Sequence, residues 1–268
     1  TGEPTFTTAT DGTFKFIGLA AGTYRIRDVL PTGWRRTLPT AGDYDVTVAA
    51  GQTVTGKDFA ETTRAVISGT IFNDTNGNAL KDSTEAAVSG RVVFLDTNKN
   101  GKLDTGELSF TTGADGKYSF VIPAGTYRVR DVLPAGWRRT LPSAGYYDAT
   151  VTSGQAIASK NFAETTRGLI SGVVFNDTNG NAVKDSTEVA LSGWVVFLDT
   201  NNNGKLDSGE LSVTTGADGK FSFVVPAGTY HLREVLKSGF TRTTPSTGVF
   251  TLTLGSGQVI TGKNFGDR

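Results

Sequence analysis

Hydrophobic and polar residues alternate along short segments of this 268-residue chain. From Lys117 to Ile122, Tyr118, Phe120 and Ile122 fall on one face and polar residues fall mainly on the other. Residues 126–133 continue with apolar residues on one face and arginines on the opposite one. A period of two residues is that of a β-strand with one buried face.

Similar segments recur every eight to twelve positions and are separated by turn residues such as Asp115-Gly116, a pair that favours tight hairpins. Residues 90–95 are apolar on both faces, which predicts a central strand. The pattern predicts an all-β fold built from small Greek-key, immunoglobulin-like sandwiches with about seven strands in antiparallel order. The expected strands are 65–72, 90–95, 108–112, 117–122, 126–133, 146–151 and 157–162.

The chain repeats itself. Ile67 corresponds to Ile170 and Asp96 to Asp199, at a constant spacing of 103 residues. A unit of this size is a domain rather than one turn of a solenoid. We therefore expect two full β-sandwich repeats at 65–166 and 167–268, preceded by the later part of a truncated repeat at 1–64.

Residues 96–107 have the spacing of a twelve-residue calcium loop. Oxygen-bearing side chains occupy positions one, three, five, nine and twelve, and Gly101 stands at position six. Calcium takes about six to eight oxygens, so a short loop must turn its side chains inward around one point. The seventh residue would supply a backbone carbonyl, and the glutamate at position twelve both of its carboxylate oxygens.

The pattern occurs four times, at 74–85, 96–107, 177–188 and 199–210. No helix is expected on either side, so these loops join strands. The predicted metal ligands are Asp74, Asn76, Asn78, Leu80, Asp82, Glu85, Asp96, Asn98, Asn100, Lys102, Asp104, Glu107, Asp177, Asn179, Asn181, Val183, Asp185, Glu188, Asp199, Asn201, Asn203, Lys205, Asp207 and Glu210.

The opposing interpretation is that these segments are Asx-rich turns with solvated carboxylates. Carboxylates held about 5 Å apart repel by roughly 3 kcal/mol per pair at an effective dielectric near 20, and a cation removes that cost. Calcium fits better than magnesium, which keeps its own waters in a smaller shell. Ala79 and Ala182 replace the glycine at position six, where a positive φ is often needed, so these two loops are expected to bind more weakly or to fold differently.

Composition removes other classes of function. Lys plus Arg and Asp plus Glu both total 26, so no net field attracts nucleic acid or a membrane surface. Cysteine is absent and no apolar run reaches the length of a membrane span. No catalytic triad, phosphate-binding loop or zinc spacing occurs, and His231 replaces Arg128 of the preceding repeat on an outward face. We therefore expect no enzyme.

The segments 72–85, 88–107, 111–120 and 124–137 resemble the B repeats of the serine–aspartate-repeat (Sdr, SdrD B-like) surface adhesins of Gram-positive bacteria. The resemblance covers nearly the whole chain. It implies a Cna-B-type, prealbumin-like sandwich that binds Ca²⁺ and carries a ligand-binding head. Some relatives close a Lys–Asn cross-link assisted by an acid, for which Asp131 and Glu234 are placed. The first strands contain no lysine, so no cross-link is expected.

The leading hypothesis is a calcium-stabilised stalk or spacer of a secreted or surface-anchored bacterial adhesin, structural and possibly part of an extracellular fibre. One alternative is a module that binds carbohydrate or host protein around Trp194 or the Trp-Arg-Arg triplets at 34–36 and 137–139. Another is an accessory domain of a large extracellular hydrolase.

The expected partners are neighbouring repeats of the same chain. Residues 1–3 match 105–107, so the first repeat is expected to lack two early strands and both acidic loops. Such a repeat would expose a sheet edge, which invites self-association or a donor strand from another molecule.

Overall fold

The computed structural model describes residues 2–268 and contains strands but no helix within that range. None of its described segments is therefore a helix long and apolar enough to cross a membrane. Contacts between Cα atoms divide the chain into two compact units. One contains residues up to 67 with 120–126 and 150–157, and the other contains 68–119, 127–149 and 158–268.

The middle repeat folds into two sheets. One has the order β10-β13-β5-β12 with β8 beside β5, and the other has the order β11-β9-β6-β7. Its strands are β5 (Ala65–Asn73), β6 (Val92–Leu95), β7 (Ser109–Thr111), β8 (Lys117–Ile122), β9 (Gly125–Asp131), β10 (Arg138–Leu141), β11 (Tyr147–Val151), β12 (Ala156–Ile157) and β13 (Phe162–Thr165).

The first and closing strands of each full repeat pair in parallel, whereas the sequence predicted an antiparallel order throughout. Ile157 lies opposite Ile67 in β5, and Phe162 lies opposite Ile71. The closing segment is also split into β12 and β13, with Ser159 at a φ of 62° between them. The pattern of apolar residues shows which face is buried but carries no information on strand direction.

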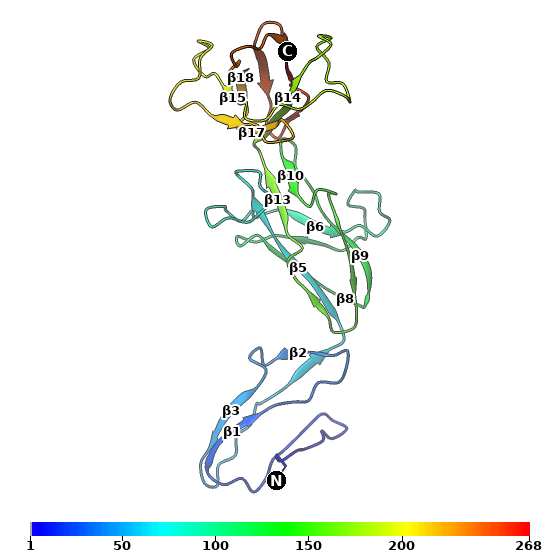
Figure 1. Ribbon diagram of the computed structural model, residues 1–268. Coiled ribbons are helices and arrows are strands. Elements are labelled where there is room, and N and C mark those ends of the chain that lie inside the picture. The colour runs from blue at the N-terminus through cyan, green and yellow to red at the C-terminus, as the bar shows by residue number, and fades with distance from the viewer. Residues whose placement is uncertain (1) are drawn as a thin grey trace. The chain divides into compact units, whose positions relative to one another are not determined.

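The last repeat has the same arrangement, with sheets β17-β14-β22-β19 (β21 beside β14) and β16-β15-β18-β20. Figure 1 shows two long loops, yellow and yellow-green, leaving its sheets on opposite sides. Its strands are β14 (Gly168–Asn176), β15 (Val195–Leu198), β16 (Ser212–Thr214), β17 (Lys220–Val225), β18 (Gly228–Glu234), β19 (Arg242–Thr244), β20 (Phe250–Leu254), β21 (Val259–Ile260) and β22 (Phe265–Asp267).

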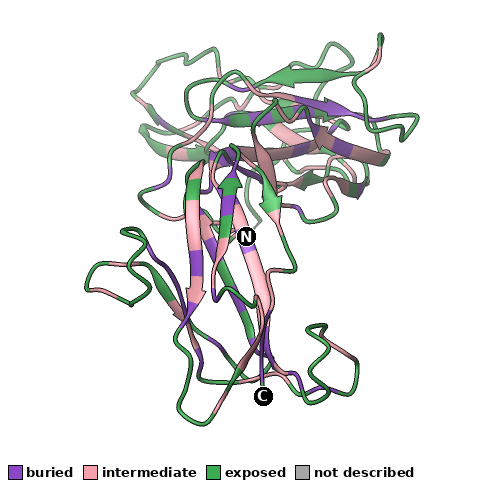
Figure 2. Cartoon of the chain, turned by 90° about the horizontal axis from the view of Figure 1, so that it is seen from above, coloured by how far each residue is buried: buried purple, intermediate pink, exposed green. Residues whose placement is uncertain are grey.

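Apolar side chains at alternate positions along the strands fill the core between the two sheets. In β8, Tyr118, Phe120 and Ile122 are buried and the residues between them are exposed, as predicted. β6 is an inner strand of its sheet, also as predicted. Figure 2 shows the result, with purple buried segments along the strands and mostly green loops. The core therefore lies within each sandwich and leaves the acidic loops at the surface.

The first repeat contains two two-stranded sheets, β1-β3 and β2-β4. Among residues 2–64 the buried apolar residues are Pro39 and Val46, while Ile17 is 80% exposed. No counterpart of β5 lies between these strand pairs within the described residues. The strands are β1 (Gly22–Ile26), β2 (Arg35–Leu38), β3 (Tyr44–Val48) and β4 (Ala60–Thr62).

Candidate metal-binding loops

Each acidic loop starts where a core strand ends. β5 ends at Asn73 and Asp74 follows, and β6 ends at Leu95 and Asp96 follows. The backbone N–H of Asp74 donates to the carbonyl of Glu164 at 2.8 Å, and that of Asp96 donates to the carbonyl of Arg128 at 2.8 Å. These bonds continue the sheets by one residue. They hold the first aspartate of each loop buried at the rim of the sandwich.

In the loop 96–107, side-chain oxygens accept backbone N–H groups along the turn. Gly101 N–H donates to Asp96 Oδ2 at 3.0 Å. The amide oxygen of Asn98 accepts from Asn100 N–H at 3.0 Å, and that of Asn100 accepts from Lys102 N–H at 2.7 Å. Positions one, three and five therefore direct their oxygens toward the inside of one turn.

Positions nine and twelve close the same loop. Asp104 Oδ2 accepts the side-chain N–H groups of Asn98 and Asn100 at 2.7 and 2.6 Å. These two bonds hold the pKa of Asp104 below its usual value. Glu107 accepts the N–H of Thr97 at 2.7 Å and that of Asp104 at 3.1 Å. Five of the six predicted ligand positions of this loop thus contribute side chains to one hydrogen-bonded ring.

The other three loops repeat the bonds at positions one and nine, while in the loop 177–188 the N–H of Thr178 donates to the Asn176 carbonyl and not to Glu188. Position one accepts from position six in each, at 2.9 Å for Ala79, 2.8 Å for Ala182 and 2.8 Å for Gly204. The carboxylate at position nine accepts both asparagine amides in each, at 2.6–3.1 Å. The alanine loops thus adopt the conformation of the glycine loops, contrary to the expectation that they could fold differently.

The backbone explains why alanine is accepted at position six. Ala79 and Ala182 have φ values of 64° and 65°, in the same left-handed region as Gly101 and Gly204 at 80°. Position four is also left-handed. It holds glycine in the alanine loops, at 77 and 180, and holds Lys99 or Asn202 in the glycine loops. In every loop, glycine thus occupies one of the two left-handed positions four and six, and another residue type occupies the other.

Two buried carboxylate oxygens in the loops lack a hydrogen-bond partner. Asp96 Oδ1 and Glu188 Oε1 are buried and have no hydrogen-bond partner among the described residues. No group of three or more His, Cys, Asp or Glu side chains within residues 2–268 is placed to hold a metal by itself. Each loop instead combines three carboxylates with two asparagine amides, and an oxygen-only set of this kind suits a hard cation such as Ca²⁺.

Two arginines beside the glycine loops were not predicted from the sequence. Arg130 Nε donates to Asp96 Oδ2 at 2.7 Å, and Arg233 Nε donates to Asp199 Oδ2 at 2.7 Å. Burial raises the pKa of Asp199, but the N–H groups of Gly204 and Asn203 and the Arg233 guanidinium outweigh it and lower that pKa. The partners are far apart in the chain, so spacing within the loop could not reveal them.

A second cluster of acids and arginines lies in the sandwich of the middle repeat. Arg139 Nε donates to Asp131 Oδ1 at 2.7 Å, and Arg91 Nε donates to Glu164 Oε2 at 2.6 Å. Burial, together with the neighbouring Asp131 carboxyl, raises the pKa of Glu164 to about 8. Asp131, placed by resemblance as the acid of a cross-link, is thus the partner of Arg139.

The last repeat builds the same cluster with exchanged residues. Glu234 stands for Asp131 and Asp267 for Glu164, and Arg242 Nε donates to Glu234 at 2.8 Å. Trp194 stands for Arg91 and is 2% exposed, with its ring 5.1 Å from that of Phe240. The prediction that Trp194 is a surface contact residue is wrong, because the indole fills the core space that Arg91 and Trp137 share in the middle repeat.

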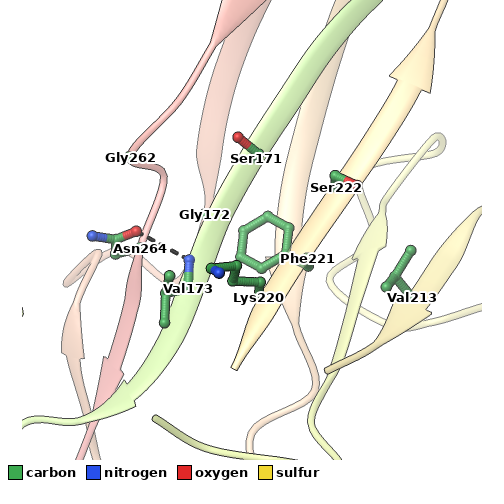
Figure 3. Close-up of a pocket in the computed structure, with 9 residues that line it drawn as sticks. All are labelled: Ser171, Gly172, Val173, Val213, Lys220, Phe221, Ser222, Gly262 and Asn264. Carbon is green, nitrogen blue, oxygen red and sulfur yellow. Dashed lines mark hydrogen bonds between the residues drawn. The ribbon is translucent and has the colours of Figure 1, made fainter. Parts of the chain in front are cut away.

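His231, Asn264 and the first Trp-Arg-Arg triplet have local partners. His231 Nδ1 lies 3.1 Å from Thr251 Oγ1 on an outward-facing strand. Asn264 Oδ1 accepts the N–H of Val173 at 3.0 Å, at the edge of a shallow pocket between β14 and β17 (Figure 3). Trp34 is 44% exposed, and Arg35 beside it donates to the carbonyl of Arg64. These contacts place the side chains without bringing them together into a site.

A known family of protein domains matches the two full repeats. The model of the SdrD B-like domain family matches residues 65–167 and 168–254. Serine-aspartate repeat-containing protein D of Staphylococcus aureus (strain Newman) is 31% identical over 269 residues, which cover 91% of this chain and 20% of that protein. Serine-aspartate repeat-containing protein F of Staphylococcus epidermidis is 30% identical over 271 residues, covering 91% of this chain and 15% of that protein. The chain thus spans about a fifth or less of these relatives.

Two solved structures match at lower sequence identity. A streptococcal ancillary pilin is 18% identical with a TM-score of 0.30, and the match covers 93% of this chain and 76% of the pilin. The Bacillus anthracis TIE protein is 15% identical with a TM-score of 0.30, covering 97% of this chain and 45% of that one.

Proposed function

Because the chain belongs to the SdrD B-like domain family, we propose that its repeats form a calcium-stabilised stalk of a bacterial surface protein. In this proposal the repeats are structural and non-catalytic, and they hold other parts of an extracellular adhesin away from the cell. Neighbouring repeats of the same chain are their partners. The relatives named serine-aspartate repeat-containing proteins support this setting.

The observation that carries the proposal is the shared network of the four loops. The carboxylate of Asp104 accepts hydrogen bonds from the side-chain amides of both asparagines in its loop. Its counterparts in the other three loops do the same. Folding has therefore already gathered the oxygens of each loop. A cation would replace amide N–H groups around a carboxylate and would satisfy the unpartnered oxygen of Asp96.

Calcium bound in this way would contribute charge neutralisation and cross-linking of the loop. The aspartates at positions one and nine and the glutamate at position twelve would hold it, with the asparagines at positions three and five. Sites with Kd of about 10⁻⁴–10⁻³ M are typical of extracellular modules, where calcium is abundant. Such sites stay filled and stabilise the fold rather than signal.

The test is thermal unfolding of the full chain with calcium and with a chelator. A ligand present at 100 times its Kd stabilises the folded state by about 2.7 kcal/mol per site. For domains of about 100 residues this corresponds to an increase in Tm of about 10 °C. Magnesium at equal concentration is the control and should have a smaller effect, because it keeps its own waters.

Variants distinguish calcium binding by the loops from other effects of calcium on Tm. Glu107→Gln and Glu210→Gln remove a carboxylate from the two glycine loops and should reduce the calcium-dependent shift of their repeats. Asp115→Asn removes an exposed carboxylate from a hairpin turn and should leave that shift unchanged. Equal melting with calcium and with chelator would refute the calcium part of the proposal.

The alternative function, a ligand-binding module, is no longer supported by Trp194. Trp194 is buried against Phe240 and cannot contact a ligand at the surface. Trp137 lies under the guanidinium of Arg91, with the guanidinium carbon 4.2 Å from the ring centre. Trp34 remains the exposed aromatic residue of the Trp-Arg-Arg triplets. The structural role therefore has the better support.

A further inference from the structure

The turn after β20 contacts the end of the middle repeat. Ser256 Oγ lies within donating distance of two carbonyls, that of Gly136 at 2.8 Å and that of Thr166 at 3.2 Å. The backbone N–H of Gly257 donates to the same Thr166 carbonyl at 2.7 Å. All these residues lie in one compact unit of the chain. A Ser-Gly turn of one repeat is thus bonded to the backbone of the repeat before it.

The same contact is made a second time, one repeat earlier. Ser153 Oγ donates to the carbonyl of Thr63 at 3.2 Å, and the N–H of Gly154 donates to that carbonyl at 2.8 Å. These residues also share one compact unit, the other of the two. Two independent copies of this joint therefore have the same donors and the same acceptor position.

Glycine is required in this turn by the approach of the preceding repeat. A Cβ on Gly257 would lie 2.8 Å from the carbonyl oxygen of Gly136, and a Cβ on Gly154 would lie 2.6 Å from that of Gly33. Both distances are shorter than atoms of this kind tolerate. The backbones of consecutive repeats are in contact at the turn, with no space for a side chain.

The first repeat supplies a natural comparison. Its equivalent turn carries Ala50 in place of the serine and keeps glycine at position 51. Gly51 has a φ of 72°, close to the 70° of Gly154 and the 64° of Gly257, but a Cβ there would meet no described atom within 4 Å. The positive φ thus belongs to the turn itself, whereas the serine and the close approach belong to the joint.

The loop 74–85 also takes part in the later joint. A Cβ on Gly77, at position four of this loop, would lie 2.9 Å from Val224 Cγ2 in β17 of the last repeat. Val121, the counterpart of Val224 in the middle repeat, is 54% exposed, while Val224 is partly covered. Gly77 and Val224 lie in the same compact unit as the contacts of Ser256 and Gly257. The joint therefore has an apolar contact as well as hydrogen bonds.

We propose that the Ser-Gly turn between the last strands is a docking element that fixes each repeat on the one before it. Its partner is the preceding repeat of the same chain, recognised through the Pro-x-Gly-Trp turn and the threonine carbonyl. The inference rests on the proposed stalk function only for its purpose, because the contacts are made by the chain itself without metal. It assigns the stiffness of the stalk to a joint as well as to the loops.

The experiment measures how tightly two repeats are held. The chain has no cysteine, so Ala114→Cys and Ala217→Cys place spin labels at equivalent exposed turns of the middle and last repeats. Pulsed dipolar spectroscopy then gives the distribution of the distance between the labels. We expect a narrow distribution in the otherwise unchanged chain, and a clearly broader one after Gly257→Ala or Ser256→Ala.

Matched control variants distinguish loss of docking from backbone strain and from loss of folding. Gly51→Ala imposes the same backbone strain in a turn without a neighbour and should leave the distribution unchanged. Ser238→Ala removes an exposed hydroxyl from another turn of the last repeat, outside the joint, and should do the same. Ser256→Ala deletes one surface oxygen, so its repeat should melt as before, and this variant decides the matter if Gly257→Ala does not fold.

Calcium and chelator arms distinguish this inference from the proposed function. If calcium raises the Tm but Ser256→Ala and Gly257→Ala leave the distribution narrow, the joint is refuted and the calcium stalk stands. If the variants broaden the distribution although calcium has no effect on melting, the joint stands and the calcium proposal fails. A broad distribution in the unchanged chain in both arms would also refute the joint.

Discussion

Single residues in the acidic loops are held in a backbone conformation that their type disfavours. Ala79 and Ala182 have positive φ values, as do Lys99 and Asn202 two positions earlier in the glycine loops. An L-residue in this region costs about 1–2 kcal/mol. The sequence indicated the first pair, because alanine replaced an expected glycine. It did not indicate the second pair, because the loop pattern does not restrict position four.

This strain leads to a prediction at residue 79. Ala79→Gly should raise the free energy of unfolding by about 0.5–1 kcal/mol, because relief of strain exceeds the entropy that glycine adds to the unfolded chain. Gly101→Ala should lower it by about 1 kcal/mol for the converse reason. Denaturant unfolding in chelator measures both changes.

Ala114→Gly is the matched control for the change at residue 79. This exposed hairpin residue is absent from the positive-φ set, so glycine there should only destabilise, by about 0.5–1 kcal/mol. If Ala79→Gly destabilised the chain as much as Ala114→Gly, the left-handed backbone would not be a source of strain.

At the scale of elements, the alternation of apolar and polar residues predicted where strands lie but not which strands pair with one another. The expected strand 117–122 is β8 without change, and 65–72 differs from β5 by one residue. β10 was missed because Arg138–Leu141 has no apolar alternation and depends on pairing with β13. The arginines that form ion pairs with Asp96 and Asp199 were missed for a similar reason, because they come from a neighbouring strand and not from the loop.

The burial of Glu234 in β18 and of Asp267 in the closing strand β22 was not predicted from the sequence either. Burial raises the pKa of Glu234 to about 8 and that of Asp267 to about 6. The unfolded chain releases these protons near the ordinary value of 4.5 for glutamate. Between these values the folded state binds more protons than the unfolded state, so the free energy of unfolding falls as the pH rises.

The prediction concerns Glu234→Gln, which is neutral at every pH. The unchanged last repeat should lose up to about 1.4 kcal/mol of stability per pH unit through Glu234 between about pH 5 and 8, and through Asp267 only below about pH 6. The variant should show a clearly smaller slope. Asp218→Asn, at an exposed turn, should leave the slope unchanged. Thermal unfolding in chelator across this range is the measurement, and parallel slopes for all three proteins would contradict the burial of a proton.

At the scale of the whole molecule, the repeats differ in completeness. The repetition in the sequence predicted that the first repeat lacks two early strands and both loops, and residues 2–64 form paired strands without a central one. Ile17, Val29 and Trp34 are 80%, 94% and 44% exposed there. Exposed apolar groups beside unpaired strand edges favour pairing with another chain. The sequence did not predict what these apolar groups contact, because residues 2–64 contain no counterpart of β5.

The first repeat should therefore make the chain self-associate. Light scattering after size exclusion should show a mass that rises with concentration for residues 1–268, and a constant monomer mass for residues 65–268, which begin at β5. A peptide with the sequence of β5, Ala65–Asn73, should lower the association of the longer chain, because in the full repeat this strand joins β8 to β12 and β13. A peptide with the same residues in scrambled order is the control, since it lacks the two-residue period that buries one face. If the longer chain stayed monomeric at every concentration, its strand edges would be closed from within, and neither self-association nor a donor strand would be needed.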